Sequence, residues 1–82
     1  MSQQDKLLSR LRDQPRDFTW GELKRLLNGF GYVETKGSGS RRKFVHRETK
    51  VTISLHEPHP AKVLKAYQIR DVLMHLKQEK YL

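Results

Sequence analysis

The 82-residue sequence contains no cysteine. This absence excludes disulfides, thiolate catalysis and zinc sites that use sulfur ligands. The sequence also lacks any apolar run near the roughly 20 residues that cross a bilayer, and its start, MSQQDKLL, lacks the apolar stretch of a signal peptide. We therefore expect a cytoplasmic protein that has no membrane partner.

Acidic residues are scarce relative to basic ones. The chain has 9 Asp and Glu against 17 Lys and Arg, a formal net charge of +8, which favours a polyanionic partner. The densest basic cluster lies between residues 36 and 50 and is opposed there only by Glu48; it comprises Lys36, Arg41, Arg42, Lys43, Arg47 and Lys50. At this length we expect one domain over residues 1–82, with a single small core.

Hydrophobic periodicity predicts two helices in the first part of the chain. Leucines recur at helical spacing in residues 1–14 and a proline follows them, which predicts a short helix ending near that point. Thr19 and Glu22 have the spacing of a capping box, which satisfies free amides at a helix start. The stripe of a second helix follows: Leu23, Leu26, Leu27 and Phe30.

After Gly31 the pattern changes to short extended segments. YVETK, RKFVH and VTISL predict three antiparallel strands in a meander. The prolines of HEPHPAK predict a loop, and a last helix is expected to start around residues 66–68. We therefore predict an α+β fold in which helices cover one face of a three-stranded antiparallel sheet and leave the other face open.

The second predicted strand places cations on that open face. If Phe44 points to the core with Ile53, alternation puts Arg41 and Lys43 on the opposite side, beside the flexible GSGS segment. Such a surface can hold phosphates. The alternatives are a solvated strand whose charges protect a sheet edge and a GSGS segment that is only a flexible turn. The charge pattern alone leaves these interpretations open.

The four histidines differ in context. His56 and His59 flank Glu-Pro in the predicted loop, a pattern too irregular for a metal site, and the chain has no HExxH motif, so we expect no metal and no cofactor. Proton transfer is the better functional interpretation of these two, because histidine titrates near neutral pH. We expect His75 to be an ordinary surface residue of the last helix.

Three segments in order resemble a known family. GSRRKFVH (39–46), VTI (51–53) and HPAKVLKAYQIRDVL (59–73) look like the HicA toxins, small bacterial endoribonucleases that act on mRNA and are neutralised by a HicB antitoxin. The resemblance covers about residues 19–76 and implies a fold like a double-stranded RNA binding domain, with residues 1–14 as an extra N-terminal helix. Individual positions match as well: Gly39, Ser40, Phe44, His46, His59 and Pro60.

One position departs from the family pattern. Arg41 stands where the family has its catalytic histidine, after Gly-Ser, and arginine stays protonated, so it can bind phosphate but cannot act as a general base. Catalysis would then pass to His46 or His59, although an even offset from Phe44 aims His46 towards the core unless the strand end turns it outward. The expected RNA-binding residues are Lys36, Ser40, Arg41, Arg42, Lys43 and His56.

Three hypotheses follow for the function. The first is a HicA-like toxin that binds RNA and cleaves mRNA without a metal, with RNA and a HicB-like antitoxin as partners. The second, motivated by Arg41, is a non-catalytic RNA- or DNA-binding module of the same fold. The third is a protein-interaction domain whose open face docks an acidic partner. Affinity that falls steeply with salt distinguishes the two nucleic-acid hypotheses from the third.

Overall fold

Helices and strands occur in the predicted order. The computed structural model describes residues 3–82; the first two residues of the predicted 1–14 helix lie outside the described residues. The elements are α1 (Gln3–Arg12), α2 (Trp20–Gly29), β1 (Tyr32–Lys36), β2 (Arg41–His46), β3 (Thr52–His56) and α3 (Ala66–Gln78). The strands form an antiparallel sheet in the order β1-β2-β3, so the predicted α+β fold is confirmed.

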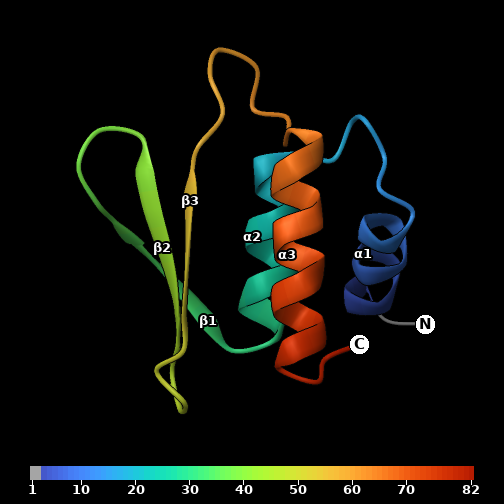
Figure 1. Ribbon diagram of the computed structural model, residues 1–82, viewed down its shortest axis with the longest axis vertical. Coiled ribbons are helices and arrows are strands. Elements are labelled where there is room, and N and C mark those ends of the chain that lie inside the picture. The colour runs from blue at the N-terminus through green and yellow to red at the C-terminus, as the bar shows by residue number, and fades with distance from the viewer. Residues whose placement is uncertain (1–2) are drawn as a thin grey trace.

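The elements are arranged in three layers. The sheet forms one outer layer, α2 and α3 lie together in the middle, and α1 packs on the far side of these two helices (Figure 1). No helix among residues 3–82 lies on the other face of the sheet in this view, which leaves that face open (Figure 1). None of the described helices is long and apolar enough to cross a bilayer.

A capping box starts α2, as the sequence predicts. Thr19 Oγ1 accepts a hydrogen bond from the Glu22 amide at 3.1 Å, and Glu22 Oε1 accepts one from the Thr19 amide at 3.0 Å. Arg10 of α1 donates to the same carboxylate, with 3.0 Å between Nε and Oε2. Burial acts to raise the pKa of Glu22, but the bonds from Thr19 and Arg10 lower it further than burial raises it. This ion pair fixes α1 against the start of α2.

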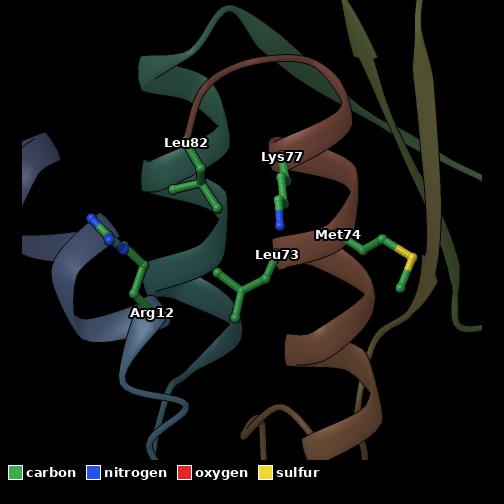
Figure 2. A pocket seen from close by; sticks show the side chains of 5 residues that line it. All are labelled: Arg12, Leu73, Met74, Lys77 and Leu82. Carbon is green, nitrogen blue, oxygen red and sulfur yellow. The ribbon is translucent and has the colours of Figure 1, made fainter.

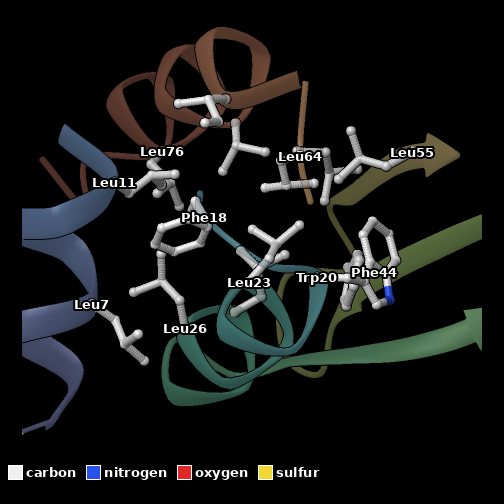
Figure 3. Packing of buried hydrophobic residues seen from close by; sticks show 14 of the residues in the cluster. Leu7, Leu11, Phe18, Trp20, Leu23, Leu26, Phe44, Leu55, Leu64 and Leu76 are labelled. Carbon is white, nitrogen blue, oxygen red and sulfur yellow. The ribbon is translucent and has the colours of Figure 1, made fainter. Parts of the chain in front are cut away.

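One apolar core connects all three layers. Phe18, which is fully buried, lies among leucines of α1, α2 and α3 (Figure 3). Trp20 packs on Phe44 of β2 with 5.6 Å between ring centroids. The sheet adds Ile53 and Leu55 from β3. Because apolar side chains at one face of each strand supply this core, the polar residues between them must point to the open face.

Candidate nucleic-acid interface

The open face of the sheet is polar at one end and partly apolar at the other. Cross-strand register places Val33, Val45 and Thr52 in one row near the β2–β3 turn, and Thr35, Lys43 and Ser54 in the next. Arg41 and His56 pair beyond them, at the end nearest the β1–β2 loop. Among the described residues this face carries no Phe, Tyr or Trp. Its cationic end is therefore the part suited to an anion.

A polar hollow occupies the cationic end. It has a volume of about 350 Å³ and is lined by Arg41, Lys43, Ser54, Leu55 and His56. Side chains that face each other across neighbouring antiparallel strands have Cβ atoms about 4.5–5.5 Å apart. The pairing of Arg41 with His56 and of Lys43 with Ser54 thus brings two cations, one imidazole and one hydroxyl to one place. The predicted positions of Arg41 and Lys43 on the open face agree with this arrangement.

His56 is held at this hollow by contacts on both its ring and its backbone. Its Nδ1 lies 3.3 Å from Ser40 Oγ, and Nε2 has no hydrogen-bond partner among residues 3–82. The His56 carbonyl accepts a hydrogen bond of 2.8 Å from Nε2 of Gln68, a residue of α3 that is 3% exposed. One ring nitrogen is therefore fixed by Ser40, and the other makes no hydrogen bond to the described residues.

Glu57 follows His56 and points away from solvent, at 9% exposure. Its carboxylate pairs with Arg42, with 3.4 Å between Oε1 and Nε, and with the ammonium of Lys62. The hydrogen bond from Lys62 is the main reason that the pKa of Glu57 lies below its usual value, with smaller contributions from the charges of Arg42 and His59. The Glu57 amide also donates to the Ser40 carbonyl at 2.8 Å.

Three residues expected to bind RNA do not line the hollow: Lys36, Ser40 and Arg42, of which Ser40 still contacts the His56 ring. Arg42 has a side chain that is 16% exposed, and its guanidinium donates to the carbonyls of Gly39 at 2.8 Å and Arg41 at 2.9 Å as well as pairing with Glu57. Lys36 is exposed at the end of β1, opposite Arg42 in the register. The structure brings together Ser40, Arg41, Lys43 and His56, and turns Arg42 inward.

His46 is buried, on the core side that strand alternation indicated. Its Nδ1 accepts hydrogen bonds from the amides of Glu48 and Thr49, at 3.1 and 3.3 Å, so the ring hydrogen lies on Nε2, which donates to the Phe30 carbonyl at 2.9 Å. Gly31 has φ +102°, and a Cβ there would come within 2.9 Å of His46 Nε2. Both ring nitrogens of His46 therefore form hydrogen bonds with backbone groups.

The expectation that His75 is an ordinary surface histidine was wrong. Its Nε2 lies 2.7 Å from the hydroxyl of Tyr32, and the two rings pack edge to face. Burial lowers the pKa of His75 and raises that of Tyr32 to about 12. Sequence alone gave no sign of this contact, because it joins residues 43 positions apart.

His59 lies in the loop after β3 and is exposed. It does not line the hollow, although its charge acts on Glu57. Ser54 was not among the expected RNA-binding residues, although the alternation of β3 places it on the open face beside Arg41 and Lys43. Glu57 was missed, because nothing in the chain order pairs it with Arg42.

A second, larger hollow has different chemistry. It measures about 410 Å³ and lies between the end of α1, α3 and the C-terminal residue, lined by Arg12, Leu73, Met74, Lys77 and Leu82. Figure 2 shows Arg12 across from Leu73 and Leu82. Met74 is 62% exposed. Among the described residues, its lining is mainly apolar and includes two cations, Arg12 and Lys77, but no histidine and no hydroxyl group.

A family model described as the HicA toxin of bacterial toxin–antitoxin systems matches residues 20–78. This range covers the whole sheet, α2 and α3, and leaves α1 outside. No curated protein and no solved structure matches the chain.

Proposed function

The chain belongs to the HicA toxin family, and from this premise we propose that it binds RNA on the open face of its sheet and cleaves it. Membership also implies an antitoxin partner, which we propose to be HicB-like. The observation that carries the proposal is the hollow in which Arg41, Lys43 and His56 converge.

Phosphate binding is the first task of this surface. Arg41 and Lys43 supply positive charge without a facing carboxylate in the hollow, and Ser54 adds a hydroxyl. A face without Phe, Tyr or Trp among its described residues offers no large ring on which bases could stack. The protein therefore contacts the sugar–phosphate backbone and its 2′-hydroxyls more than the bases.

Cleavage requires a proton acceptor beside the 2′-hydroxyl. In our proposal Nε2 of His56 takes that proton, the 2′-oxygen attacks phosphorus, and the bond from phosphorus to the 5′-oxygen breaks. Arg41 stabilises the negative charge on the phosphoryl oxygens. His59, exposed in the next loop, delivers a proton to the departing 5′-oxygen. The products are a 2′,3′-cyclic phosphate and a 5′-hydroxyl, and no step uses His46.

The test compares one labelled RNA with the same sequence carrying 2′-deoxyriboses. We expect the purified protein to bind both and to cut only the RNA, leaving a 2′,3′-cyclic phosphate. Binding should weaken with salt at a log–log slope of about 0.7 per phosphate contacted on a single strand. Arg41→Gln should lower both the affinity and this slope, whereas Arg70→Gln, an equal charge change on an exposed site of α3, should change them less.

A non-catalytic nucleic-acid module of the same fold is the second candidate. The observations that favour it are the arginine at position 41 and the position of His59 outside the hollow. Equal binding of RNA and its deoxy analogue, with neither cut at high protein concentration, would establish this alternative. Binding that salt does not weaken would refute both candidates.

A further inference from the structure

Glu57 joins three segments around the proposed RNA site, two through its carboxylate and one through its backbone amide. It pairs with Arg42 of β2 and with Lys62 of the loop before α3, and its own amide bonds to Ser40 at the end of the β1–β2 loop. Ser40 in turn contacts the His56 ring. The residue thus lies behind the hollow and contacts the segments that carry its walls.

The same carboxylate changes which cations are available. Arg42 and Lys62 are both within ion-pair distance of Glu57, whereas Arg41 and Lys43 line the hollow. The guanidinium of Arg42 is also bound to two carbonyls, so it is oriented inward. Of these four cations, only Arg41 and Lys43 are therefore positioned to contact a ligand in the hollow.

We propose that Glu57 is a positioning residue of the RNA site, with two effects. It holds the Ser40 segment against β3 so that His56 stays beside Arg41, and it withholds Arg42 and Lys62 from the RNA. This inference rests on the proposed function. Its consequence is that a phosphate binds in one place, at Arg41 and His56, and is not spread over four neighbouring cations.

Removal of the carboxylate charge should therefore move affinity and turnover in opposite directions. In Glu57→Gln the freed cations can contact RNA, so binding should tighten and its salt slope should steepen by up to about 1.4, at about 0.7 for each of two cations. Turnover at saturating RNA should fall, because His56 and Arg41 no longer hold one phosphate between them. A residue that served only stability would lower both quantities together.

Glu48→Gln is the matched control. It makes the same change in net charge at an exposed position of the β2–β3 turn. We expect it to leave the slope and the turnover near those of the parent. Glu57→Asp keeps a carboxylate, so it should restore the parent slope while turnover recovers only in part. Equal slopes and equal turnover in Glu57→Gln and Glu48→Gln would overturn the proposal.

Hydrogen exchange provides a measurement that needs no RNA. The Glu57 amide donates to Ser40, and its exchange in Lys62→Gln should be about tenfold faster than in the parent, because bonds to charged groups contribute on this order. This variant changes a half-exposed partner and leaves the buried position occupied. Unchanged exchange would refute the positioning role. Failure of the parent to bind RNA would instead refute the proposed function, so the two failures are distinguishable.

Discussion

The molecule contains two pairs of histidines in opposite environments. His46 and His75 lie around Tyr32, on the core side; both ring nitrogens of His46 bond to backbone groups, and Nε2 of His75 lies 2.7 Å from the Tyr32 hydroxyl. His56 and His59 are exposed at the other end of the sheet and in the loop beyond it. His56 keeps one ring nitrogen without a partner among the described residues.

The two environments suit the two pairs of histidines to different tasks: the core-side pair to stability and the exposed pair to proton transfer. A ring whose two nitrogens complete backbone hydrogen bonds cannot exchange protons with a substrate without breaking those bonds. An exposed ring with one fixed and one free nitrogen is oriented and still accessible to a substrate, as a general base must be. Under the proposed function, the two pairs of histidines therefore have different roles, and substitutions should separate them.

The largest expected effect is on activity, in His56→Ala. We expect RNA cleavage to fall about 10²- to 10⁴-fold, the usual contribution of a general acid or base. The free energy of unfolding should stay within about 0.5 kcal/mol of the parent because the side chain is exposed. Single-turnover cleavage and urea unfolding measure the two quantities. Full RNA cleavage by His56→Ala would contradict the proposed role of His56 as the proton acceptor.

The opposite result is expected for His46→Ala. Loss of a buried ring that bonds three backbone groups should lower the free energy of unfolding by about 2–3 kcal/mol. Cleavage by the fraction that remains folded should be unchanged. His46→Asn keeps an acceptor near the Nδ1 position for the amides of Glu48 and Thr49, so it should be less destabilising. A folded His46→Ala protein without activity would assign His46 to catalysis instead.

Sequence reasoning succeeded where the pattern is local. The capping box of Thr19 and Glu22 and the alternation around Phe44 each depend on residues a few positions apart, and the structure confirms both. Alternation also gave the inward direction of His46, from its even offset to Phe44. These features follow from the helical and strand periods, which any single sequence displays.

The pairings across the chain could not be predicted in this way. Arg42 has an even offset from Phe44, so alternation indicates its inward direction, but its ion pair with Glu57, 15 positions later, could not be predicted from the sequence. His75 lies on a helix face that the chain pattern marks as surface, and the contact with Tyr32 depends on how α3 crosses the sheet. Register and helix packing decide these contacts, and neither is encoded in local spacing.

The smallest expected effect concerns pH and His75. Burial lowers the pKa of this histidine in the folded chain, whereas in the unfolded chain it has the ordinary value of 6.5. The unfolded state therefore binds more protons, so this contribution to stability is complete above pH 6.5 and declines as the pH falls through 6.5 towards the lower folded value.

Urea unfolding at pH 5.5 and 7.5 measures this change. Both pH values lie above 4.5, the ordinary pKa of Glu22 and Glu57. The parent should be less stable at pH 5.5, and His75→Gln, which cannot titrate, should show a smaller difference between the two pH values. In protonated His75 both ring nitrogens are donors, so the Tyr32 hydroxyl, 2.7 Å from Nε2, must accept. If the free energy of unfolding changes between pH 5.5 and 7.5 by the same amount in His75→Gln and in the parent, the titrating group is not His75.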